Sequence, residues 1–169
     1  LALANEYIAF CTEHGIEPAK VASRIQLTLS VGSNYFMEIA KLRAARLLWS
    51  TMVEQYKLEC PCAYRVRINT VASTWNKTTF DPYVNMLRST TEGMSAVIGG
   101  TDALSLQPFD VTYKESDEFS RRIARNVQVL LKEESFFDRV VDPAAGSYYI
   151  ETLTNSIAEQ VWKLFQEVE

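Results

Sequence analysis

The sequence predicts an α/β fold with a parallel sheet, because segments with strand periodicity alternate with longer segments of helical periodicity. Residues 24–31 and 64–71 each alternate apolar and polar side chains, as half-buried strands do, and residues 101–107 form a shorter strand candidate. A parallel strand covered on both faces usually reads as a continuous apolar run, but both clear strands here keep a polar face. We therefore favour a helix-covered (β/α)8 barrel of the TIM type with a polar lumen, of which this chain supplies a part.

The first helix is expected over residues 1–14, which carry an apolar stripe with no capping residue before it. This abrupt start suggests a fragment of a longer chain. Gly15 suits the position just after a helix, and Pro18 follows as a stop. Ser33 or Asn34 is expected to cap a long helix that connects the first two strands as a crossover.

A further helix is expected after the second strand, with Asp81 as its N-cap and Pro82 at its first position. The Gly99-Gly100 pair should end this helix, and its alternative role as a phosphate-binding turn is disfavoured because no helix begins directly after it. The remaining helices are expected to begin at Ser116 and at Thr152 or Thr154.

The composition is that of one ordinary globular domain: 169 residues, 47% hydrophobic and 22% charged, with a net charge of −4. This balance excludes a basic nucleic-acid binder and a disordered chain. No apolar run approaches the roughly 18 to 20 residues that a membrane span requires. We expect a soluble protein of the cytoplasm.

The three cysteines are odd in number, so we expect reduced thiols and no disulfide framework. Cys60-Pro-Cys62 could be half of a metal site, but a structural zinc site needs four ligands and His14 is the one histidine. We therefore predict no metal site and solvent-exposed thiols. His14 is expected to relieve the helix dipole at the end of the first helix.

Polar-face arginines and a loop tryptophan are the remaining candidates for binding. Arg24, Arg65 and Arg67 lie on or near the predicted strands, where they could hold a phosphate or carboxylate, or pair with Asp102 or with a carboxylate of another strand. Trp75 follows a strand, so it is either a ligand contact at the carboxyl end of the sheet or a residue packed on its rim. Spacing assembles no catalytic triad and no acid–base pair.

Four blocks of the chain read SNYFMEIAKLRAARLLW, NTVASTWNKTTFDPYVNMLRSTTEGMSAVIGGTDALS, EFSRRIARNVQVLLKEES and VVDPAAGSYYIETL. In this order and spacing they resemble the methylmalonyl-CoA mutase family. The resemblance implies an adenosylcobalamin-dependent radical rearrangement between methylmalonyl-CoA and succinyl-CoA in a (β/α)8 barrel, with a separate C-terminal flavodoxin-like domain for cobalamin. Residues 1–169 would be the C-terminal portion of the barrel domain: about its last three β/α units with the C-terminal helices. The cobalamin domain's Asp-x-His-x-x-Gly motif is absent, and the family's catalytic Tyr-His pair belongs to an earlier strand.

The resemblance places seven positions against substrate or cofactor: Arg24, Gln26, Asn69, Val71, Trp75, Asp102 and Val111. Arg24 and Trp75 agree with a catalytic chain of the family. The other five stand where such a chain has serine, histidine, glutamine, glutamine and glutamate, in that order, and Thr74 replaces a glycine. The acid at Asp102 would repel CoA phosphates, and Val71 offers a ligand no hydrogen bond.

This pattern implies the small, non-catalytic subunit of a bacterial heterodimeric mutase, with the large catalytic subunit as its partner. Adenosylcobalamin belongs to the holoenzyme and is not expected on this fragment, nor is a nucleic acid or a membrane. Two alternatives stay open: a catalytic acyl-CoA mutase chain with altered specificity, and a free-standing CoA-thioester-binding barrel. The two free sheet edges also predict that the isolated fragment self-associates, with residues 24–31 at the contact, or depends on the remainder of its own barrel.

Overall fold

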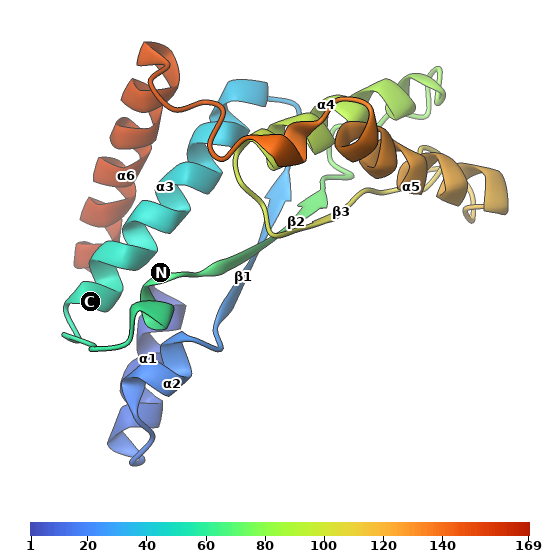
Figure 1. The fold of residues 1–169 in the computed structure, drawn as a ribbon. Helices are drawn as coiled ribbons and strands as arrows, with labels where there is room; N and C mark the ends of the chain where they lie inside the picture. Colours follow the sequence, from blue (N-terminus) through green and yellow to red (C-terminus); the bar gives the residue numbers. More distant parts are fainter.

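A computed structural model describes all residues 1–169, and its centre is a three-stranded parallel sheet in the order β1-β2-β3 (Figure 1). The strands are β1 (Gln26–Val31), β2 (Arg67–Ala72) and β3 (Ala103–Ser105). Gln26 pairs with Arg67 and Asn69 with Ala103. The predicted α/β class with a parallel sheet is confirmed, although each strand is shorter than its sequence pattern.

Helices connect and flank these strands, with two short 3-10 turns between them. Helix α3 joins β1 to β2, α4 joins β2 to β3, and α6 runs alongside α3 in Figure 1. The helices are α1 (Ala2–Glu13), α2 (Pro18–Ala22), α3 (Tyr35–Glu54), α4 (Val84–Ile98), α5 (Glu118–Glu133) and α6 (Tyr148–Val168). The 3-10 turns are Pro61–Tyr64 and Phe137–Arg139.

The hydrophobic core covers one face of the sheet. Val31 and Ile68 are fully buried there among side chains of α3, which include Leu42 and Trp49. Every second strand residue points to the other face, where Gln26 and its neighbours on the same side stay exposed. The sheet is therefore covered on one side and open on the other, as the alternating pattern predicted.

Two predicted helix starts are wrong by one to two residues. The backbone of Asp81 has a φ of +46°, so it turns the chain before the helix and does not cap it, and α4 begins at Val84 after Tyr83. For α5 the N-cap is Asp117, whose Oδ1 accepts from the backbone N–H of Ser120 at 2.9 Å. Asp117 supplies the charged acceptor that a helix N-terminus favours.

Two further differences lie near the ends of the chain. Pro18 begins the short helix α2, because proline suits a first helical position as well as it stops a preceding helix. The last helix begins at Tyr148 after Ser147, and Thr152 and Thr154 lie inside it. The predicted helix ends at Gly15 and at Gly99-Gly100 are confirmed, and the φ of +83° at Gly100 is one that glycine adopts without strain.

The prediction of reduced thiols at Cys60 and Cys62 is wrong, because the two residues form a disulfide. The 3-10 turn that starts at Pro61 brings their Cα atoms to 5.3 Å, within the range that a disulfide spans. Cys11 is the free cysteine. A count of cysteines could not reveal this pair, because its formation depends on the local turn.

Candidate functional site

The open face of the sheet brings three of the predicted site residues together. Gln26 lies at the start of β1, and Asn69 and Val71 follow one another along the same face of β2. The register also places two small polar side chains of β1 on this face, Thr28 opposite Asn69 and Ser30 opposite Val71. Beyond the Gln26–Arg67 pair at its amino end, the face therefore offers neutral side chains, with Val71 among small polar groups.

Asp102 lies at the amino end of this face, just before β3. Its Oδ2 accepts from the backbone N–H of Ile68 at 2.7 Å and from Arg46 at 2.8 Å. The guanidinium of Arg46 also donates to the carbonyls of Val66, at 2.8 Å, and of Gly100. Asp102 is therefore committed to holding α3 and the starts of two strands together, which is a structural role.

The predicted pairing of the strand arginines with Asp102 is wrong. Arg24 and Arg65 precede β1 and β2, Arg67 is the first residue of β2, and all three are exposed and free of ion pairs. Helix α3 supplies the partner, Arg46, instead. The sequence spacing could not predict this partner, because Arg46 lies in the middle of a long helix and reaches the sheet edge only through the way the helix packs.

Trp75 stands beyond the carboxyl end of β2 and is 95% exposed, so it does not pack on the rim of the sheet. The two residues after it are held by Glu92 of α4. Asn76 Nδ2 lies 2.6 Å from Glu92 Oε1, and Lys77 Nζ lies 2.5 Å from Oε2. The Lys77 and Glu92 side chains are both fully buried. The loop is thus fixed while its tryptophan faces solvent.

A second buried polar side chain joins this loop to the one after β3. Asn85, near the start of α4, accepts from the backbone N–H of Thr78 at 3.1 Å and donates to the Thr78 carbonyl at 2.9 Å. It also donates to the carbonyl of Phe109 at 3.0 Å. The Phe109 loop carries Val111, which is 37% exposed. Neither Glu92 nor Asn85 was a sequence candidate, although both fall on the buried face of α4.

A third polar cluster fastens α6 to α3. Arg43 donates to Asp142 at 3.0 Å, to Glu151 at 2.8 Å and to Thr154 at 3.2 Å. The hydrogen bond from Arg43, helped by the Gly146 N–H, lowers the pKa of Glu151. His14 is the C-cap residue of α1, at the predicted helix end, and its Nδ1 lies 2.8 Å from the Phe10 carbonyl.

No group of three or more histidine, cysteine, aspartate or glutamate side chains is placed to hold a metal ion. No helix is both long and apolar enough to cross a membrane. Arg65, Arg67 and the Asp102–Arg46 pair line one hollow at the amino end of the sheet.

The chain is thus an α/β protein whose parallel sheet has one open polar face and carboxyl-end loops that are held in place. The family model described as methylmalonyl-CoA mutase matches residues 1–169. The chain therefore belongs to the methylmalonyl-CoA mutase family.

Relatives include both subunit types of that enzyme. The chain is 56% identical over 173 residues to the methylmalonyl-CoA mutase small subunit of Porphyromonas gingivalis, covering all of this chain and 28% of that protein. It is 43% identical to methylmalonyl-CoA mutase of Rhizobium meliloti and 37% identical to the large subunit of P. gingivalis, in each case covering all of this chain and 24% of the relative. The chain thus spans about a quarter of the length of these curated relatives.

Proposed function

We propose that this chain is part of the small, non-catalytic subunit of an adenosylcobalamin-dependent methylmalonyl-CoA mutase and supports a large catalytic subunit. The observation that carries the proposal is the difference in similarity within one organism. Against P. gingivalis the identity is 56% with the small subunit and 37% with the large subunit, over the same residues of this chain. A chain of the catalytic type would be expected to reverse that order.

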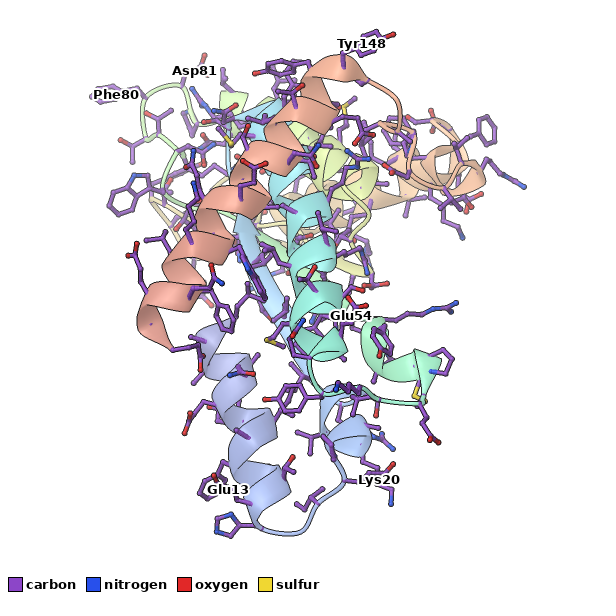
Figure 2. All side chains as sticks on the ribbon, turned by 90° about the vertical axis from the view of Figure 1, so that its left-hand side faces the viewer. Glu13, Lys20, Glu54, Phe80, Asp81 and Tyr148 are labelled. Carbon is purple, nitrogen blue, oxygen red and sulfur yellow. A yellow bond between two sulfur atoms is a disulfide. The ribbon has the colours of Figure 1, made fainter.

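The side chains of the open face support the same conclusion. Gln26, Asn69 and Val71 share the face with no acid, no base and no imidazole among them. Residues 1–169 contain one histidine, His14, which follows the C-terminal end of α1. Figure 2 places the neighbouring Glu13 at the opposite end of the molecule from Phe80, which lies in the loop after β2. These residues do not fit a cobalt ligand, so no step of the reaction is assigned to them.

The sheet fits part of a (β/α)8 barrel. Its strands are parallel and in chain order, successive strands are joined by helices α3 and α4, and the open polar face would line the lumen. Residues 1–169 would form the last three β/α units, followed by α6. The remaining strands would come from the rest of the longer polypeptide and would cover the free edges of β1 and β3.

The test is to purify the full-length polypeptide alone, the large subunit alone, and the two together. We expect no mutase activity and no corrin absorbance with the first, and full activity with the pair. The double variant Asn69→His/Val71→Gln should restore no turnover to the polypeptide alone, because Gln26 and Asp102 remain unchanged. Turnover or bound corrin in the unpartnered polypeptide would show that it is a catalytic chain, and the proposal would be wrong.

The free-standing CoA-thioester-binding barrel is tested in the same preparations. Titration of the unpartnered polypeptide with an acyl-CoA, followed by calorimetry, should show no specific binding beyond weak, salt-screened charge attraction to the exposed arginines. Self-association of the isolated residues 1–169 through β1 stays a prediction, and sedimentation of that fragment at tens of micromolar checks it. A well-folded monomer would contradict it.

A further inference from the structure

The disulfide between Cys60 and Cys62 lies beside an arginine-lined hollow at the amino end of the sheet. Cys62 is exposed and Cys60 is partly buried. Cys62 forms part of the wall of the hollow, which has a volume of about 660 Å³ and is also lined by Arg46, Arg65 and Arg67. A small molecule in this hollow would therefore meet a disulfide sulfur and guanidinium groups together.

The hollow carries a surplus of positive charge. It is lined by three arginines and one carboxylate, that of Asp102, which is already bonded to Arg46. Arg65 and Arg67 are exposed and make no ion pair, so their donors are free for an anion. Glu59 precedes Cys60 in the sequence but does not line the hollow. The Cys62 side of the disulfide is thus the electropositive side.

This disulfide adds little constraint to the fold. It closes a ring of only three residues, and a short ring removes less freedom from the unfolded chain than a long one. Nearby guanidinium groups stabilise a thiolate, so they favour opening of the bond. Exposure of Cys62 gives an attacking thiol access. These are the features of an exchangeable disulfide.

The turn that carries the disulfide is anchored without it. Ala63 is fully buried, and its carbonyl accepts from the buried Trp49 Nε1 at 2.9 Å. The hydroxyl of Tyr64 donates to the carbonyl of Leu58 at 3.1 Å. The Ala63 N–H also donates to the Cys60 carbonyl at 3.1 Å. The sulfur–sulfur bond can therefore open while the backbone keeps its place.

We propose that Cys62 is a thiol–disulfide exchange site for small anionic thiols, which Arg65 and Arg67 draw into the hollow. The thiolate of the small thiol attacks Cys62 Sγ and forms a mixed disulfide. The Cys60–Cys62 bond breaks, and the Cys60 sulfur leaves with the electron pair and takes a proton from water. A second molecule of the thiol attacks the mixed disulfide, releases the small-molecule disulfide and leaves both cysteines reduced.

Two kinds of anionic thiol share this chemistry: a carboxylated thiol such as glutathione and a phosphorylated thiol such as coenzyme A. Both present negative charge near a reactive sulfur, which the free guanidinium donors can bind. The proposal rests on the disulfide and the hollow and does not depend on the mutase assignment.

The experiment uses the full-length polypeptide in its oxidised form. It is treated with limiting glutathione or coenzyme A, quenched by alkylation, digested and mapped by mass spectrometry. The expected product is a mixed disulfide on Cys62 with Cys60 alkylated. The thiol that reacts faster at equal thiolate concentration identifies which of the two kinds, carboxylated or phosphorylated, the hollow favours. Because charge attraction drives entry, mercaptoethanesulfonate should react faster than the cationic thiol cysteamine, and salt should reduce the difference.

The double variant Arg65→Gln/Arg67→Gln should slow exchange with anionic thiols by roughly three- to tenfold and leave the rate with cysteamine unchanged or higher. Arg125→Gln, an exposed arginine of α5 away from the hollow, is the matched control and should change neither rate. The Cys11→Ser variant should give the same product map as the wild type. Equal rates for anionic and cationic thiols, a mixed disulfide on Cys60 alone, or no exchange at all would overturn the proposal.

Discussion

The two ends of the sheet handle charge in opposite ways. At the carboxyl end, Glu92 and Lys77 are both fully buried and bonded to each other, and Asn76 donates to the same carboxylate. At the amino end, the Arg46 and Asp102 side chains are 37% and 47% exposed. One ion pair is inside the protein and the other is half-exposed to solvent, although each joins a helix to a segment next to a strand end.

The fold depends on its polar groups mainly at the carboxyl end of the sheet. A buried charge that loses its partner cannot recover its hydration, so breaking such a pair costs several kcal/mol, whereas an exposed pair contributes about 0 to 1 kcal/mol. The loop after β2 is therefore held at Asn76 and Lys77, next to the exposed Trp75. The amino end keeps free guanidinium groups available to a ligand.

The largest expected effect follows removal of the buried carboxylate. Glu92→Ala leaves the Lys77 ammonium and the Asn76 amide buried without their acceptor. We expect the free energy of unfolding of the full-length polypeptide to fall by about 3 to 5 kcal/mol. Urea unfolding monitored by circular dichroism measures this change.

A paired variant separates the ion pair from the packing. Glu92→Leu together with Lys77→Met replaces both charges with apolar side chains and should lose clearly less than Glu92→Ala, because no charge remains buried alone. A loss below about 1 kcal/mol for Glu92→Ala would mean that Lys77 reaches water in solution, and the contrast between the two ends would fail.

Asn85→Ala should have the second largest effect, again at the carboxyl end. The change leaves the Thr78 N–H and the carbonyls of Thr78 and Phe109 without their buried partner. We expect a loss of about 1 to 3 kcal/mol in the free energy of unfolding. The matched control is Asn126→Ala on the exposed side of α5, which should change stability by less than about 0.5 kcal/mol. Equal losses in the two variants would contradict the prediction.

The strands and the open face could be predicted from the sequence because they depend on local alternation. Gln26, Asn69 and Val71 fall on one face simply because side chains alternate along a strand and the strands pair in parallel. The helix ends at Gly15 and Gly100 were equally local, since both residues have a positive φ. For these features, pattern alone was sufficient.

The polar partnerships could not be predicted in this way. Glu92 meets Lys77 across 15 positions of the chain, and Arg46 meets Asp102 across 56. Such contacts require the helix to be placed on the sheet, which periodicity does not specify. The Cys60–Cys62 bond was missed for another reason, because the odd number of cysteines argued against a disulfide framework, whereas the bond depends on the geometry of a three-residue turn.

A smaller effect should appear as a dependence on pH at the start of α5. The hydrogen bond from Lys114 Nζ, followed by that from the Ser120 N–H, lowers the pKa of Asp117 to about 2 from an ordinary value of 3.8. Because the folded value is the lower one, Asp117 stabilises the fold above about pH 4, and this contribution is lost as the pH falls toward about 2.

The measurement compares the wild type with Asp117→Asn at about pH 5 and about pH 3 by urea unfolding. Asparagine keeps an N-cap acceptor but does not titrate, so the stability advantage of the wild type should shrink at the lower pH. An advantage that stays constant between the two pH values would show that Asp117 does not have a lowered pKa.

The smallest effect is expected at the amino end, for Asp102→Asn. The amide oxygen of asparagine can still accept from the Ile68 N–H, and Arg46 keeps its bonds to the Val66 and Gly100 carbonyls. Only the charge attraction of a half-exposed pair is lost, so the free energy of unfolding should change by about 0 to 1 kcal/mol. The same change removes the one carboxylate from the hollow beside Cys62, so anionic thiols should react faster there. A loss as large as that of Glu92→Ala, measured in the same urea series, would show that solvent exposure does not distinguish the two ends of the sheet.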